Sequence, residues 1–280
     1  MDIGLFGIGS GPCGDAAVAR AVAVAAETAG YESLWTGEHV VLPDPQAPPS
    51  PAPPEFPMLH PSTILAYLAG VTERVKLGTG IVLLPQRNPV VLAKELASLD
   101  VVSGGRLIFG LGVGYLRAEF DALGVPFEGR GARSDEYLAA MKALWTQEKP
   151  AYDGRFVSFS GVQARPRPVQ QPHPPIVVGG MSDAAYRRAV ATGNGWYGFA
   201  LDVAGTKAAI AGLEKAAKEV ERPADLGRLT ISVTPSLRVD AEVARQLEDL
   251  GVDRIVSLMG GRDEGSLLAF VDALANEVIA

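Results

Sequence analysis

The strongest constraint on the fold is a regular alternation of short β-forming runs with longer helical patterns along all 280 residues. The first strand is predicted over 3–8, and a helix from Asp15 to Gly30 follows, because these residue types favour helix ends. Further strands are predicted over 33–37, 75–84, 106–112, 175–179, 195–199, 229–237 and 253–258. Parallel strands need helical crossovers, so eight such repeats predict an α/β fold, a single (β/α)8 TIM barrel.

Two insertions interrupt this repeat. Residues 43–61 hold nine of the 21 prolines, which predicts an extended loop after the second strand. Residues 152–168, within an insertion of about 151–170, alternate apolar side chains around Asp153-Gly154, which predicts a hairpin before the fifth strand. Because loops of barrels carry function, we expect both insertions, with the loops after the last two strands, to shape the site.

Charge and cysteine content narrow the possible partners. With 25 basic and 32 acidic residues the net charge is −7, so nucleic acid is not expected as a partner. Cys13 is the one cysteine, which excludes an internal disulfide and a cysteine-rich metal site and fits a reducing cytoplasm. The apolar run 16–29 is short and contains Arg20 and Glu27, so no membrane span is expected.

A GxGxxG pattern, Gly9–Gly14, follows the first predicted strand, and Glu38 stands 24 residues beyond it. One interpretation is a dinucleotide site of the Rossmann type. Pro12 removes one amide that such a site would use, and regular β/α units continue where a Rossmann half would end. The pattern therefore favours the other interpretation, a loop over the barrel mouth.

Glu38-His39 follows the second strand, at the end of a barrel where catalytic residues gather. An imidazole beside a carboxylate can donate or accept a proton near neutral pH. His60 and His173 stand next to prolines in predicted loops. His39 is therefore the candidate acid or base, with a purely structural role as the alternative.

Glycines and a helix start suggest a ligand with a planar part and an anionic part. The third predicted strand carries Gly78 and Gly80, and the fourth carries three alternating glycines within Phe109–Tyr115. They leave space for a planar ligand or reflect tapering of the barrel. Gly179–Ser182 opens a helix and offers a phosphate seat or an ordinary cap. Arg130 and Arg133 could reach a phosphate or pair with the acids at 135–136.

In order and spacing these motifs closely resemble the luciferase-like monooxygenase superfamily, specifically its branch of coenzyme F420 (deazaflavin)-dependent oxidoreductases. The resemblance is dense over about residues 1–200 and looser beyond. The matching motifs are Glu38-His39, Leu77–Ile81 with Asn88-Pro89, Gly104-Gly105-Arg106, Gly112–Tyr115, Arg133–Tyr137 and the stretch from Arg165 to Gly180.

The resemblance implies that a flavin or deazaflavin binds at the carboxyl ends of the strands, over a non-prolyl cis peptide at Gly80–Ile81. It implies that His39, beside Glu38, serves as proton donor or acceptor, and these two are the predicted catalytic residues. The implied cofactor-binding positions are Gly80, Ile81, Gly112, Val113, Gly114 and Tyr115 near the ring, Gly179, Gly180, Met181 and Ser182 near the phosphate, and Arg133.

Two positions depart from the sugar-phosphate dehydrogenases of this branch. Those enzymes carry Asp-His where Glu38-His39 stands, and a glutamate acid where this chain has Tyr115. A tyrosine with a pKa near 10 is a poor base at neutral pH. Sugar-phosphate oxidation is therefore not the predicted reaction.

The predicted activity is hydride transfer between F420 and a small organic substrate. The alternatives are an FMN-dependent monooxygenase and a deazaflavin-binding barrel without turnover. Phe6 and Trp35 near strand ends could favour apolar or planar substrates, or could belong to the core. A homodimer is expected from the family resemblance.

Overall fold

Nine parallel strands pair in a closed ring within residues 1–279, the part of the chain that the computed structural model describes. The short β4 pairs with β5 beyond the end of β3, so β3 and β4 share one barrel position. The structure therefore confirms the (β/α)8 barrel. The ring runs from β3 (Lys76–Thr79) through β2 (Ser33–Thr36), β1 (Asp2–Phe6), β11 (Arg254–Leu258), β10 (Thr230–Pro235), β9 (Gly195–Leu201) and β8 (Ile176–Gly179) to β5 (Leu107–Gly112), which pairs with β3 and with β4 (Val82–Leu83).

The predicted third strand, residues 75–84, is divided in the structure. β3 ends at Thr79, β4 begins at Val82, and the Gly80–Ile81 peptide between them is cis. The cis peptide implied by the family resemblance is thereby confirmed. The division places Gly80 and Ile81 at the mouth of the barrel.

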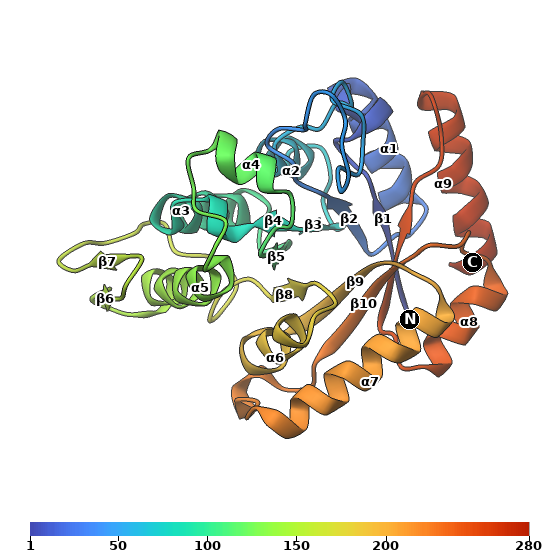
Figure 1. The fold of residues 1–280 in the computed structure, drawn as a ribbon. Helices are drawn as coiled ribbons and strands as arrows, with labels where there is room; N and C mark the ends of the chain where they lie inside the picture. Colours follow the sequence, from blue (N-terminus) through green and yellow to red (C-terminus); the bar gives the residue numbers. More distant parts are fainter. Residues whose placement is uncertain (280) are drawn as a thin grey trace.

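Helices surround the ring of strands (Figure 1). The predicted cap at Asp15 is confirmed, since its carboxylate accepts hydrogen bonds from the amides of Ala17 and Val18. Each main helix follows a strand, so its N-terminal end lies on the side of the mouth. The helices are α1 (Ala16–Thr28), α2 (Pro61–Ala69), α3 (Pro89–Val102), α4 (Arg117–Ala122), α5 (Arg130–Thr146), α6 (Asp183–Thr192), α7 (Val203–Glu219), α8 (Ala241–Asp249) and α9 (Glu264–Val278).

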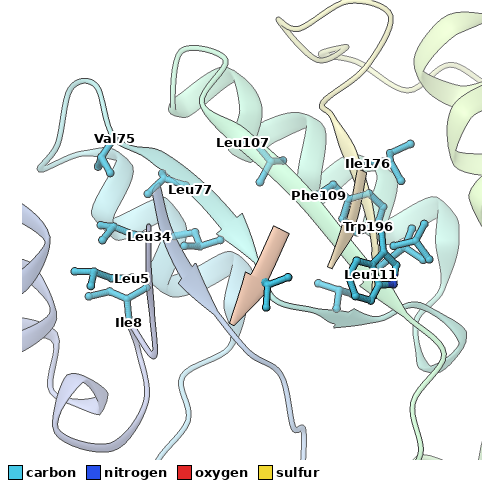
Figure 2. Close-up of a cluster of buried hydrophobic side chains, with 14 of the residues drawn as sticks. Leu5, Ile8, Leu34, Val75, Leu77, Leu107, Phe109, Leu111, Ile176 and Trp196 are labelled. Carbon is cyan, nitrogen blue, oxygen red and sulfur yellow. The ribbon is translucent and has the colours of Figure 1, made fainter. Parts of the chain in front are cut away.

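The fold has two apolar layers, one outside the ring of strands and one inside it. The outer layer lies between strands and helices, and Figure 2 shows part of it, including Leu34 and Leu77. Neighbouring residues of a strand face opposite sides, so Trp35 points inward where Leu34 points outward. The inner layer consists of Trp35, Ile108, Val177, Tyr197 and Val256. These side chains fill the interior, and a ligand cavity lies beyond them at the carboxyl ends of the strands.

The proline-rich insertion is an extended loop, as predicted. Residues 37–60 contain no helix or strand within the described chain, apart from an antiparallel bridge between Ser10 and Met58. Gly11 N–H donates to the Pro57 carbonyl at 3.0 Å, and Leu59 N–H donates to the Gly9 carbonyl at 2.8 Å. These bonds fasten the loop to the turn after β1.

The second insertion forms the predicted hairpin, with β6 (Tyr152–Asp153) antiparallel to β7 (Ser158–Phe159). Figure 1 shows it at the periphery, beyond α3 and α5. Glu136 on α5 accepts hydrogen bonds from three amides of its turn, residues 155–157. No described residue between 151 and 170 lines the cavity at the mouth. The expectation that this insertion shapes the site is wrong, because a segment between a helix and the next strand returns to the opposite end of the barrel.

No helix among residues 1–279 combines the length and the apolar character needed to cross a membrane.

Gly110 provides a test of barrel packing. An added Cβ there would overlap the carbonyl oxygen of Thr79, whose hydroxyl is also bonded to both Gly110 backbone groups. Gly110→Ala should therefore lower the free energy of unfolding by about 1–3 kcal/mol or more, measured by urea denaturation. In the control Gly265→Ala, the new Cβ meets only Asp263 at 3.8 Å, so stability should hold or rise slightly. Equal losses in both variants would contradict this packing.

Candidate active site

A cavity of about 740 Å³ opens at the carboxyl ends of the barrel strands. This volume lies within the range of roughly 300–1,000 Å³ typical of ligand sites. Gly80 and Ile81 line it between β3 and β4, and Phe199 and Leu258 line it from β9 and β11. The proline-rich loop and the turn after β1 supply further parts of the wall. The cavity thus lies at the end of the barrel where the sequence predicted a site, and part of the predicted residues line it.

His39 lines this cavity and is held by a carboxylate from another element. Its Nδ1 lies 3.1 Å from Oε2 of Glu119 on α4, and Oε1 of Glu119 accepts a hydrogen bond of 2.8 Å from the amide of Val40. The Glu119 side chain is fully buried, and His39 is 10% exposed. A carboxylate only accepts hydrogen bonds, so the hydrogen lies on Nδ1 and Nε2 is left for a ligand.

Glu119 is a residue that the sequence did not reveal. It stands 80 positions from His39, within a short helix that carries no recognisable motif. Only the packing of α4 over the end of β2 brings the two side chains together. The feature that marks Glu119 as unusual is the complete burial of its side chain beside Phe120. Burial becomes visible only in the structure, so the sequence alone could not reveal this residue.

Tyr115 stands beside His39, with its ring edge-on at 5.9 Å between centroids, and is half-exposed to the cavity. Burial raises the pKa of the Tyr115 hydroxyl, and the negative charge of Glu119 raises it further. The hydroxyl therefore keeps its proton at neutral pH and can donate a hydrogen bond.

Glu38 lines the cavity but has both oxygens engaged by the protein. Oε2 accepts a hydrogen bond of 2.7 Å from the amide of Leu83, and Oε1 forms an ion pair with Arg87. Its side chain is 1% exposed. In this arrangement Glu38 joins the end of β2 to β4, and its carboxylate is not free to act as a base.

The glycines of β5 make room for the protein itself. A Cβ at Gly110 would overlap Thr79, and one at Gly112 would overlap the side chain of Ile81. On β3, a Cβ at Gly78 would come within 2.5 Å of the Trp35 ring. The interpretation that a planar ligand lies against these glycines is therefore wrong for these three positions, because neighbouring residues fill the space.

The predicted cofactor positions divide into two groups. Gly112 lies beneath Ile81, Val113 lies outside the lining of the cavity, and Ser182 caps α6 by accepting a hydrogen bond from Ala185 N–H at 3.2 Å. The positions that do line the cavity are Gly80, Ile81, Gly114, Tyr115, Gly179, Gly180 and Met181.

Arg133 is buried outside the cavity lining and donates to the carbonyls of Pro126 at 2.8 Å and Glu128 at 3.3 Å. Arg130 donates to the Gly114 carbonyl at 3.0 Å and stacks on Phe127. The interpretation that these arginines pair with the acids at 135–136 is wrong, since Asp135 pairs with Arg188 and Glu136 holds the hairpin turn.

The dinucleotide interpretation of Gly9–Gly14 is also wrong. β1 lies between β2 and β11 in a closed barrel, whereas a Rossmann site needs an open sheet. Gly11 donates its amide to Pro57 of the proline-rich loop. The turn forms one wall of the cavity, as the other interpretation predicted. No group of three His, Cys, Asp or Glu residues in the described chain could hold a metal ion.

The luciferase-like monooxygenase family model matches residues 6–267. The chain belongs to this family. An uncharacterized protein of Mycobacterium tuberculosis is 31% identical over 264 residues, which cover 91% of this chain and 92% of that protein. This relative supports membership of the family along nearly the whole chain.

Two further similarities involve different cofactors. The FMNH2-dependent dimethylsulfone monooxygenase of Pseudomonas putida is 36% identical over 138 residues, 48% of this chain and 38% of that protein. The structure of the coenzyme F420-dependent tetrahydromethanopterin reductase of Methanopyrus kandleri covers 100% of this chain and 98% of its own, with a TM-score of 0.76 and 19% identity. The second likeness shows the shared fold alone.

Exchange of Glu119 for glutamine tests the His39 geometry. The carbonyl oxygen of the new side chain can still accept from Val40, but its NH2 group would face Nδ1 and favour the tautomer with hydrogen on Nε2. Nitrogen-15 NMR of the histidine rings should therefore show His39 in the Nδ1–H form in the parent protein and in the Nε2–H form in Glu119→Gln. The exposed Glu128 offers a control, since Glu128→Gln should leave the signals unchanged. If His39 had the same tautomer in the parent protein and in Glu119→Gln, the contact between Nδ1 of His39 and Glu119 would be excluded.

Proposed function

We propose that this protein is an F420-dependent oxidoreductase that transfers a hydride between the deazaflavin and a small organic substrate. The carrying observation is His39, fixed by Glu119 at a cavity whose edge is the divided strand at Gly80–Ile81. The resemblance of the motifs over about residues 1–200 to the F420-dependent branch supports the choice of cofactor. A homodimer in the cytoplasm is the expected setting, which the family resemblance and the single cysteine favour.

The residues at the mouth fit a tricyclic ring that carries a phosphate-bearing side chain. Ile81 and Phe6 offer apolar surface beside the divided strand. Gly179 and Gly180 line the cavity without side chains and lie shortly before α6, which begins at Asp183. The first amides of a helix lack intrahelical partners, and its positive end suits a phosphate.

A bound deazaflavin supplies the group that accepts or donates a hydride. Glu119 holds Nδ1 of His39, so that Nε2 can take a proton from a substrate hydroxyl or return one to a carbonyl. Tyr115 can hold the same oxygen by donating a hydrogen bond. Glu38 serves as a positioning residue that fixes the end of β2, which replaces the catalytic role expected from the sequence.

An FMN-dependent monooxygenase is the second candidate. The identity of 36% with an FMNH2-dependent monooxygenase favours it, although the match covers only 48% of this chain. The third candidate is a barrel that binds deazaflavin without turnover. The pairing of His39 with Glu119 argues against it, because a barrel without turnover needs no oriented acid or base.

Titration with both cofactors tests the first proposal. We expect F420 to bind at least about tenfold more tightly than FMN. Binding of F420 is measured by the deazaflavin absorbance and binding of FMN by the flavin fluorescence. Met181→Glu should weaken F420 binding by about tenfold, because it brings a carboxylate to the proposed phosphate seat. Met181→Gln, matched in size but neutral, should stay near the parent value. Tight FMN binding without F420 binding would establish the second candidate instead.

Replacement of His39 tests the proton transfer. His39→Ala should lower turnover by about 10²–10⁴-fold, while the dissociation constant for F420 changes little. His60→Ala is the control, since His60 is exposed at the start of α2. Stopped-flow oxidation of reduced F420 with candidate acceptors measures both variants. Unchanged turnover in His39→Ala would remove this residue from the mechanism.

A further inference from the structure

Resting on the proposed function, we infer that the substrate is a neutral, mainly apolar compound, held by Phe199, Leu258 and the proline-rich loop, with one polar group directed to His39 and Tyr115. Nothing in the family resemblance fixes this class. It follows from the charges and the exposed side chains of the cavity.

The cavity offers no partner for a charged substrate. Within the described chain, no lysine, arginine or aspartate lines it, and its one carboxylate, Glu38, is already paired with Arg87. Burial raises the pKa of the Cys13 thiol to about 11, so that it stays neutral. The Tyr197 hydroxyl is buried and bonded to Thr234. Away from the helix end that the proposed function assigns to the cofactor phosphate, a charged group of a substrate lying on Phe199, Leu258 and the loop would lose its hydration without compensation.

Large apolar side chains from separate elements are exposed toward the same space. Phe199 is 43% exposed, Leu258 52% and Phe56 37%, and each lines the cavity. Phe6 packs against Phe199 with a centroid distance of 5.0 Å, which gives a continuous aromatic wall. Exposed apolar side chains that converge on one concave site mark a surface that an apolar ligand covers.

The proline-rich loop gives the opposite wall the same character. Pro51, Ala52, Pro53, Phe56 and Met58 line the cavity. Proline has no amide hydrogen, so this wall presents few backbone donors to a substrate. The bridge between Ser10 and Met58 keeps the loop in place.

Polar groups able to meet a neutral substrate gather on one side. His39 and Tyr115 lie edge to face at the end of β2 and after β5, whereas Phe199 and Leu258 belong to β9 and β11. A molecule with one hydroxyl or carbonyl can satisfy both sides at once. Its apolar part then lies on Phe199, Leu258 and the loop.

The test uses three naphthalene compounds of equal skeleton: 2-acetylnaphthalene, 2-naphthoate and the ammonium form of 2-naphthylmethylamine. Binding is measured by calorimetry in an excess of whichever cofactor the protein binds, or on the protein as purified if it binds neither. We expect the neutral ketone to bind about tenfold more tightly than either ion, or better. An ion that binds as tightly as the ketone would overturn the inference. Failure of F420 binding alone would refute the proposed cofactor and leave this comparison intact.

A charge placed in the wall makes the test specific to this cavity. Leu258→Arg should raise the affinity for 2-naphthoate about tenfold and lower that for 2-acetylnaphthalene, whereas Leu258→Met should change neither by more than about threefold. If the arginine variant does not fold, judged by thermal unfolding, Phe56→Arg in the loop takes its place. Unaltered affinities in a folded arginine variant would show that the compounds bind elsewhere, and the inference would fail.

Discussion

The side chain of Ile81 fills space that glycines on two neighbouring strands leave open, and the site depends on this packing. A Cβ at Gly112 would overlap Ile81, and one at Gly179 would lie 3.0 Å from it. β3 can end at Thr79 and the chain can step inward because β5 and β8 carry no side chains there. The step forms one edge of the cavity. Gly112 and Gly179 thus shape the cavity indirectly, because they leave space for the side chain of Ile81.

The position of His39 also depends on a segment that is distant in sequence, the helix α4. Glu119 binds the imidazole of His39 and the amide of Val40 at once, so α4 fixes both the ring and the start of the long loop. Glu38 fixes the same strand end from the other side through Leu83. The position of His39 therefore rests on contacts from α4 and β4. An uncharged substitution at Glu119, which lies outside the cavity lining, acts on the imidazole without touching a ligand.

The order of strands and helices could be predicted because each repeat carries a local signal, such as the aspartate at Asp15. The place of His39 could also be predicted, since the carboxyl end of a barrel strand is a property of topology. Glu119 could not, because its pairing arises only when α4 packs. The sequence-based interpretation of Gly110 and Gly112 is wrong for a different reason. A missing Cβ makes room for a ligand and for a neighbouring side chain in the same way, and sequence does not distinguish them. Arg133 was likewise visible as a charge, whereas its carbonyl partners were not.

The two walls of the cavity come from different parts of the chain. The edge formed by Gly80 and Ile81, and the seat before α6, belong to the barrel itself and depend on backbone geometry. The apolar surface comes partly from Phe6, Phe199 and Leu258 on barrel strands and partly from an insertion that holds nine of the 21 prolines. Little of the net charge of −7 lies at the cavity, since Glu38, paired with Arg87, is the one Lys, Arg, Asp or Glu residue of the described chain in its lining. Under the proposed function, the backbone at Gly80–Ile81 and before α6 meets the cofactor, whereas Phe199, Leu258 and the loop meet the substrate. Changes in the loop can therefore alter substrate choice while the packing around Ile81 stays intact.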